Sequence, residues 1–230
     1  MFDIDVYLDG ATFKEAQFRD PIVKGYTFNP TLFRSLGVTD YLEFCKKILT
    51  VSSGLPVSFE VISDKPSEMI RQAELLSGLG KNVYVKIPIT YCDGTYTGFV
   101  IKQLTDKKIN INITAVFTLN QIKKVIRYIE DTKTIISVFA GRLFDIGINA
   151  TIDMFNISEF VHEESSCRVL WASPRQSYDI INACNARCDI ITMQPSLVKK
   201  LSLFNKTPES YSIDTVKMFF EDAIHASYSF

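Results

Sequence analysis

The chain has 230 residues, of which 47% are hydrophobic and 22% charged, the balance of an ordinary globular protein with one large domain. Its net charge of −1 and its pI near 6.2 exclude an electric field that would attract nucleic acid or an anionic membrane. No apolar run approaches the ~18 residues of a membrane span, so we expect neither a nucleic-acid partner nor a membrane partner.

Short apolar segments recur along the whole chain and read as β-strands. They are residues 6–8, 25–28, 57–61, 83–87, 111–117, 135–140, 169–172 and 190–192. Helical patterns lie between them, for example at residues 67–79 and 119–129. The C-terminal residues 211–230 read as a last helix, with Phe219, Phe220 and Ile224 on an apolar stripe.

Strands that alternate with helices predict βαβ units and a parallel sheet. Eight such units in this length favour the α/β class and a closed (β/α)8 TIM barrel. We expect a single barrel domain over residues 1–230, with 211–230 packing on the barrel or on a neighbouring subunit. A doubly wound open sheet is the structural alternative.

The first residues, 1–5, are acidic and lack the basic flank and apolar core of a signal peptide, so we expect a cytoplasmic protein. An odd number of scattered cysteines predicts reduced thiols rather than a disulfide framework. They are Cys45, Cys92, Cys167, Cys184 and Cys188. With two histidines and no P-loop or GxGxxG segment, we expect no metal and no other cofactor.

Lys86 stands out because it lies inside the short apolar strand 83–87 and shares a strand face with Tyr84. A lysine is costly to bury unless it has a partner or loses its charge. An amine that attacks a carbonyl carbon must be neutral, and apolar burial beside Tyr84 is expected to favour that form. We interpret Lys86 as a nucleophile that forms a Schiff base.

The alternation of the other strands points further polar side chains at the same interior. With the apolar residues turned toward the helices, each of six strands presents polar groups inward, mostly near its C-terminal end. Besides Tyr84 and Lys86 they are Tyr7, Asp9, Thr27, Asn29, Ser58, Glu60, Asn112, Thr114 and Ser137, the last on the same face as Phe139. Active sites of barrels collect at that end, so the convergence predicts an active site there.

Segments in shared order and spacing resemble a known family over nearly the whole chain. They are YLD at 7–9, GYTFNPTL at 25–32, SFEV at 58–61, VKIP at 85–88, NIT at 112–114, SVFAGR at 137–142, ASPR at 172–175 and CDIIT at 188–192. The chain resembles the transaldolase family, specifically its short members, which are related to fructose-6-phosphate aldolases. The resemblance implies a transfer of dihydroxyacetone between sugar phosphates.

The resemblance also implies catalytic roles. Lys86 matches the imine-forming lysine, and Asp9 matches the carboxylate that removes the proton of the C4 hydroxyl. Glu60 and Thr114 match a pair that holds a water for proton transfers while the imine forms and breaks.

Substrate-binding residues are implied in the same way. Asn29 and Ser137 match residues that hydrogen-bond the dihydroxyacetone portion, and Thr27, Asn112 and Phe139 line the same pocket. Arg142, Ser173 and Arg175 match the site of the terminal phosphate, where two guanidiniums suit a dianion.

The combination of Glu60 with Phe139 is that of transaldolases, whereas the aldolase-type members use a glutamine and a tyrosine that serves as acid. Transfer is therefore favoured over simple cleavage. A fructose-6-phosphate aldolase-like lyase and a non-catalytic barrel that binds sugar phosphates are the alternatives. Departures from the family pattern leave the donor and acceptor sugars open, and they stand at Gly10, Phe28, Val138, Trp171 and Gln194.

The resemblance implies sugar phosphates as partners, a place in the pentose phosphate pathway, and a homo-oligomer, because related short enzymes often form rings through C-terminal helices. The aromatic stripe of residues 211–230 fits that arrangement and equally fits packing on its own barrel.

Overall fold

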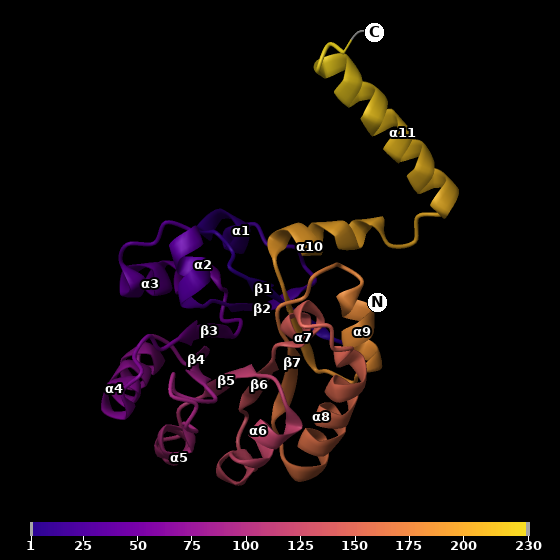
Figure 1. Ribbon diagram of the computed structural model, residues 1–230. Helices are drawn as coiled ribbons and strands as arrows, with labels where there is room; N and C mark the ends of the chain where they lie inside the picture. Colours follow the sequence, from indigo (N-terminus) through magenta and orange to yellow (C-terminus); the bar gives the residue numbers. More distant parts are fainter. Residues whose placement is uncertain (1, 229–230) are drawn as a thin grey trace. The chain divides into compact units, whose positions relative to one another are not determined.

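Eight parallel strands close into one barrel in sequence order, from β1 beside β2 round to β8 beside β1 (Figure 1). The computed structural model describes residues 2–228. The strands are β1 (Asp5–Asp9), β2 (Val23–Thr27), β3 (Val57–Glu60), β4 (Val83–Pro88), β5 (Ile111–Val116), β6 (Ile135–Val138), β7 (Arg168–Trp171) and β8 (Ile190–Met193). The predicted (β/α)8 barrel is confirmed, and the open-sheet alternative is wrong.

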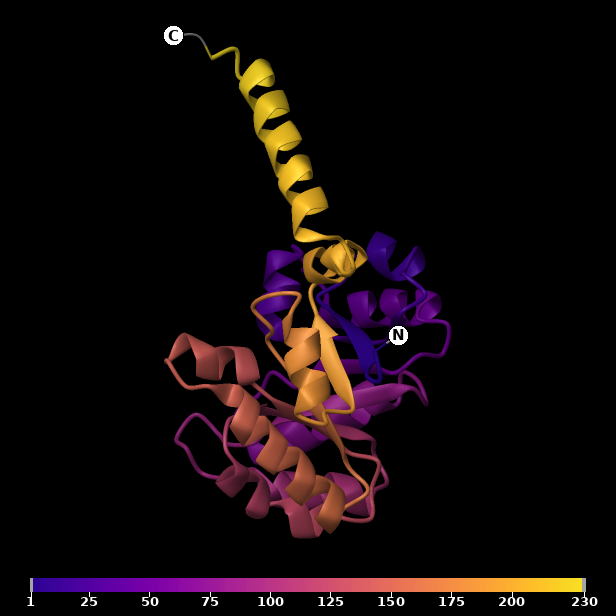
Figure 2. The same ribbon diagram turned by 90° about the vertical axis from the view of Figure 1, so that its right-hand side faces the viewer.

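Helices surround the ring of strands, as the two views in Figure 1 and Figure 2 show. Those that follow the strands up to β8 are α1 (Phe13–Gln17), α2 (Pro30–Ser35), α3 (Tyr41–Val51), α4 (Pro66–Ser77), α5 (Gly98–Asp106), α6 (Leu119–Lys123), α7 (Ala140–Asp145), α8 (Ala150–Glu164) and α9 (Asp179–Asn185). A short 3-10 helix, η1 (Ile126–Tyr128), follows α6.

The structure corrects three details of the predicted elements. The expected helix over residues 119–129 is divided between α6 and η1, because the buried, β-branched Val125 between them takes a φ of −120° outside the helical range. The expected strand 135–140 ends at Val138, and Ala140 already begins α7. The alternation along strand 111–117 predicts Ala115 on the outward face with Ile111 and Ile113. Ala115 departs from this alternation, because it has a φ of 56° at a β-bulge between Ile113 and Val116.

Two apolar layers separate the inside of the barrel from the helices. Side chains on the outward face of the strands, such as Phe59, Val85 and Ile113, are fully buried against the helices. Inside, an apolar cluster contains Tyr7, Ile135, Leu170, Ala172 and Ile190, with Tyr84 and Phe139 packed against it. The polar ends of the strands are thus set on a close-packed interior, which keeps them in fixed positions.

Phe28 lies in an aromatic cluster on the outer face of β2 and β3. Its ring centroid lies 5.6 Å from those of Phe33, Phe44 and Phe59. Because neighbouring strand residues face opposite sides, this packing turns Asn29 toward the interior. The departure from the family pattern at Phe28 therefore lies outside the barrel.

The remaining residues from Lys199 onward form a second compact unit. Helix α10 (Pro195–Lys200) is followed by the 3-10 helix η2 (Leu201–Leu203) and by α11 (Pro208–His225). The predicted last helix thus begins earlier than residue 211, and residues 229 and 230 of that prediction lie outside the described residues. No side chain of α11 is buried. Between residues 2 and 228, no helix is long and apolar enough to cross a membrane.

Candidate active site

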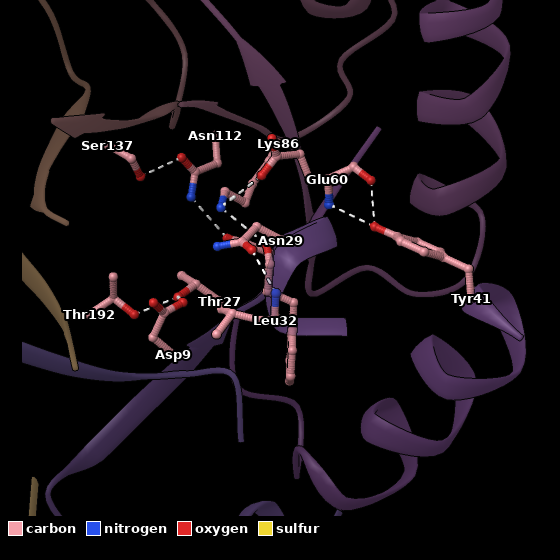
Figure 3. Close-up of polar contacts among 12 residues, drawn as sticks. Asp9, Thr27, Asn29, Leu32, Tyr41, Glu60, Lys86, Asn112, Ser137 and Thr192 are labelled. Atoms are coloured by element: carbon pink, nitrogen blue, oxygen red, sulfur yellow. Dashed lines mark hydrogen bonds and ion pairs between the residues drawn. The ribbon is translucent and has the colours of Figure 1, made fainter. Parts of the chain in front are cut away.

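The predicted catalytic side chains come from the C-terminal ends of neighbouring strands. Asp9 ends β1, Glu60 ends β3, Lys86 lies in β4 and Thr114 lies in β5. In register, Glu60 is opposite Lys86, and Lys86 is opposite Asn112. Figure 3 shows Asp9, Glu60, Lys86 and Asn112 around one small region at the barrel mouth. The alternation of side chains along the strands therefore predicted their inward positions correctly, while their roles stay predictions.

Lys86 is buried, with 5% of its side chain exposed, and its amine has two polar partners. Nζ lies 3.1 Å from Oε2 of Glu60 and donates a hydrogen bond of 3.1 Å to the carbonyl oxygen of Phe28. The surroundings differ from the apolar burial that the sequence suggested, because a carboxylate and a carbonyl meet the amine directly. Tyr84 instead packs against the apolar cluster of the interior.

Asp9 faces two hydroxyl groups in a row. Thr27 donates a hydrogen bond of 2.7 Å to Oδ1 of Asp9, and the hydroxyls of Thr27 and Thr192 lie 2.5 Å apart. Burial raises the pKa of Asp9 above its usual value, while the positive charge of Lys86 and the Thr27 hydrogen bond act in the opposite direction. A carboxylate with a raised pKa is suited to take up a proton near neutral pH.

A second polar chain crosses from β3 to β6. Asn112 donates from Nδ2 to Oγ of Ser58 at 3.0 Å, and Ser137 donates to Oδ1 of Asn112 at 2.7 Å. The structure thus brings together the predicted substrate-binding residues Asn112 and Ser137. Thr114 is buried, and among residues 2–228 its hydroxyl has no hydrogen-bond partner. A buried hydroxyl without a partner is typical of a place where water or a ligand binds.

Asn29 combines a structural contact with its predicted role. It is the N-cap of α2, where Oδ1 accepts a hydrogen bond of 2.9 Å from the backbone N–H of Leu32, and Pro30 stands at the first helical position. The cap therefore occupies the oxygen of the side chain and fixes its orientation at the barrel mouth.

The predicted phosphate residues lie on α7 and on the loop after β7, which touch each other. A Cβ atom placed on Gly141 would lie 1.5 Å from the carbonyl oxygen of Ser173, so only glycine allows this approach. Ser173 itself has a φ of 62°, in the left-handed region. The contact between α7 and this loop allows the positive charges of both Arg175 and Arg142 to act on the Asp145 carboxylate.

The two arginines differ in their contacts. The guanidinium of Arg142 lies 5.5 Å from the centroid of the Phe139 ring, and its residue is exposed. Arg175 forms a forked ion pair with Asp145, including a bond of 2.9 Å from Nε to Oδ1. An anion that binds Arg175 would therefore compete with the Asp145 carboxylate.

Trp171 ends β7, and Pro174 lies in the loop that follows it. Trp171 is fully buried on the outward face of β7, where its ring lies 6.0 Å from that of Phe144. The loop that contains Pro174 continues into two backbone N–H groups, of Arg175 and Gln176, which donate to Oδ2 of the buried Asp179.

Sequence reasoning missed three residues that contact the predicted set. Thr192 shares the inward parity of β8 and could have been found by extending the alternation to that strand. Tyr41, on α3, binds the backbone of Glu60, and Asp145, on α7, binds Arg175. No sequence pattern marked Tyr41 or Asp145 as part of the site, because each contact joins segments that come together only in the folded chain.

The described residues include no group of three or more His, Cys, Asp or Glu side chains that could hold a metal ion. A lysine and two carboxylates remain as the reactive groups of the barrel mouth. The fold and this site define a (β/α)8 barrel with a lysine-centred site at the C-terminal ends of its strands.

The family follows from a comparison of sequences. A family model described as Transaldolase/Fructose-6-phosphate aldolase matches residues 6–229. The chain therefore belongs to the transaldolase/fructose-6-phosphate aldolase family.

Curated relatives agree with this assignment, and a solved structure agrees with the fold. A "Probable transaldolase" of Thermoplasma acidophilum is 34% identical over 210 residues, which are 89% of this chain and 90% of the relative. Another of Paracoccus denitrificans is 32% identical over 200 residues, 85% and 88% of the two chains. A solved structure described as "Native KDPGal structure" has a TM-score of 0.53 at 10% identity and covers 96% of this chain and 95% of its own, which shows the fold alone.

Proposed function

We propose that the protein is a transaldolase-type transferase that moves a dihydroxyacetone unit from a ketose phosphate to an aldose phosphate. Membership of the family and the names of its relatives support a transaldolase-like enzyme. The observation that carries the finer proposal is the buried amine of Lys86, 3.1 Å from the Glu60 carboxylate at the barrel mouth.

The first half of the reaction forms an imine. The neutral amine of Lys86 adds to the C2 carbonyl of the ketose, and the carbinolamine then loses water to give a protonated imine. Proton transfers accompany both steps. Glu60 lies within hydrogen-bond distance of Nζ, and the free hydroxyl of Thr114 is a second polar group for a bound water.

The second half breaks a carbon–carbon bond. Asp9 takes the proton of the C4 hydroxyl, the C3–C4 electron pair moves into the protonated imine, and an aldose phosphate leaves. The raised pKa of Asp9 suits this proton uptake. The enamine left on Lys86 then attacks the aldehyde of the acceptor, Asp9 returns the proton to the new hydroxyl, and hydrolysis of the imine releases the product.

Substrate binding uses the remaining polar groups. The pair Asn112 and Ser137 would hold the dihydroxyacetone portion, together with Asn29. The phosphate would bind the guanidiniums of Arg142 and Arg175, and the second of these would exchange part of its contact with Asp145 for the dianion.

Capture of the imine tests the covalent mechanism. Wild-type protein incubated with fructose 6-phosphate and borohydride should gain a stable adduct on the peptide that contains Lys86. Lys86→Ala should gain none and lose turnover, whereas Lys102→Ala, which changes an exposed lysine of α5, should behave as wild type. Turnover of Lys86→Ala within about tenfold of wild type would contradict a covalent role for Lys86.

The lyase is the second candidate, and Phe139 is the observation that separates the two. Its ring offers no hydroxyl, so it cannot protonate the enamine and release dihydroxyacetone. Without an acceptor aldehyde, a transferase should therefore release almost no free dihydroxyacetone, whereas a lyase should release it continuously. Phe139→Tyr should raise cleavage relative to transfer; an unchanged ratio would remove this position from the argument. A non-catalytic barrel would give no adduct at all.

A further inference from the structure

The backbone ladder between β2 and β3 ends just before the catalytic region. The last pair in register is Thr27 with Ser58, and Phe28 donates from its backbone N–H to the carbonyl of Ser58 at 2.9 Å. One step further, a parallel ladder needs a bond from Glu60 N–H to the carbonyl of Phe28 and one from residue 30 to the carbonyl of Glu60. Residue 30 is Pro30, which has no N–H, so the second of these two bonds cannot form.

The hydroxyl of Tyr41 takes both of the missing bonds. It accepts a hydrogen bond of 3.1 Å from the backbone N–H of Glu60 and donates one to the carbonyl of Glu60 (Figure 3). Tyr41 is the first residue of α3, and its ring packs edge-on against Phe33 with centroids 4.4 Å apart. Burial raises the pKa of Tyr41 well above its usual range, so the hydroxyl keeps its proton and can donate and accept together.

This arrangement leaves the carbonyl of Phe28 free of the ladder. The carbonyl accepts instead from Nζ of Lys86 at 3.1 Å, while the side chain of Glu60 reaches the same amine from the other strand. Two of the contacts of the amine therefore depend on where the backbone of Glu60 is held.

We infer that Tyr41 is a positioning residue for the Lys86 amine: its hydroxyl replaces β2 as the partner of Glu60 and so releases the Phe28 carbonyl to bind Nζ. Tyr41 contacts the backbone of Glu60 and the ring of Phe33, and its influence on the amine passes through Glu60 and Phe28. The expected effect of Tyr41 on turnover rests on the proposed Schiff-base function. Its effect on the position of the Lys86 amine does not.

Removal of the Tyr41 hydroxyl should change the hydrogen-bond partners of both the Glu60 N–H and the Phe28 carbonyl. In Tyr41→Phe the ring still packs on Phe33, but Glu60 N–H loses its acceptor and must turn to the carbonyl of Phe28. The carbonyl is then shared or lost as a partner of Lys86, and the Glu60 carboxylate shifts relative to the amine. Because small displacements of reacting groups are costly, imine formation at Lys86 should slow by about tenfold.

The test compares wild type with Tyr41→Phe and with Tyr26→Phe as the matched control. Tyr26 is a buried tyrosine whose hydroxyl donates to the carbonyl of Ala16 at 3.2 Å, away from the barrel mouth. The rate of reductive labelling at Lys86 is followed by peptide mass mapping, once with fructose 6-phosphate and once with formaldehyde, which needs no sugar site. The rate of hydrogen exchange at the backbone amide of Glu60 is measured in the same three proteins.

Slower labelling of Lys86 with both reagents and faster exchange of the Glu60 amide, in Tyr41→Phe alone, would support the inference. A formaldehyde rate within about twofold of wild type would overturn it, even if the variant were less stable. Equal losses in Tyr26→Phe would also overturn it, since they would mark a general loss of stability. If wild type reacts with formaldehyde but gives no adduct with any ketose phosphate, the proposed function fails. The ratio of the formaldehyde labelling rates of wild type and Tyr41→Phe then still decides the role of Tyr41.

Discussion

At the scale of single residues, two carboxylates, those of Asp9 and Glu60, interact with the single amine of Lys86 at the barrel mouth. Glu60 forms an ion pair with Lys86, whereas Asp9 accepts a hydrogen bond from Thr27 and is influenced by the charge of Lys86. Thr27 must donate to Asp9 when the carboxylate is ionised, so Thr192 must donate to Thr27. This direction of the hydrogen bonds stabilises the charged form and works against the burial that raises the pKa of Asp9.

Replacement of Thr192 by valine should therefore change the pH dependence of transfer. Valine keeps the shape but removes the donor to Thr27, so the pKa of Asp9 should rise further. A general base acts as its carboxylate, and activity rises as pH increases through its pKa. The acid limb of kcat for Thr192→Val should therefore move to higher pH, while kcat on the alkaline side changes little. Initial rates over a pH series measure this shift.

Thr192→Ser serves as the control for that prediction. Serine keeps the hydroxyl and should retain the wild-type profile. Loss of activity by the same factor at every pH in Thr192→Val would instead indicate a structural defect and contradict a link to Asp9.

At the scale of elements, the phosphate region depends on how closely α7 approaches the loop after β7. The approach needs a residue without a side chain at Gly141 and a left-handed backbone at Ser173. The backbone N–H of Gly141 also lies 3.3 Å from the carbonyl of Ala172 and donates to it. The ion pair of Asp145 with Arg175 joins α7 to the same loop.

Gly141→Ala should separate α7 from the loop after β7. The new methyl group would meet a backbone carbonyl rather than the end of a flexible side chain, so the backbone itself must shift. We expect a loss of about 2 kcal/mol in the free energy of unfolding and weaker binding of inorganic phosphate, measured by urea unfolding and by calorimetry.

Gly78→Ala is the matched control, because Gly78 ends α4 with a φ of −65° and an added Cβ would come no closer than 3.4 Å to another atom. Wild-type phosphate affinity in Gly141→Ala would contradict the proposal that this loop contact builds the anion site.

At the scale of the whole molecule, the C-terminal unit presents apolar side chains to solvent. On α11, Ile213, Val216, Phe219, Phe220 and Ile224 are each more than half exposed. An apolar stripe of this length on a helix is typical of an interaction surface. It supports the prediction that the protein forms a homo-oligomer, which stays a prediction.

Sedimentation should accordingly give a mass well above the 26.1 kDa of one chain. Phe220→Glu places a charge in the stripe and should shift the distribution toward the monomer, because burial of an unpaired charge is costly. Thr215→Glu changes a position outside the stripe and should keep the wild-type distribution. A wild-type protein that sediments as a monomer at high concentration would contradict the prediction.

The sequence by itself determined the barrel and most of the candidate site. The strand spacing predicts eight βα units, and the alternation within each strand directs Asp9, Glu60, Lys86 and Asn112 inward, because side-chain direction in a strand is a local property. The same local reasoning misplaced Ala115, since a bulge forms only when a neighbouring strand sets the register.

Only the tertiary structure decided which groups hold these side chains in place. Tyr41 binds the backbone of Glu60 across 19 positions of the chain, and Asp145 binds Arg175 across 30. Such contacts depend on where helices of the outer layer pack against the strands. No residue pattern encodes them locally, because a hydroxyl or a carboxylate on a helix is equally compatible with solvent until the fold supplies its partner.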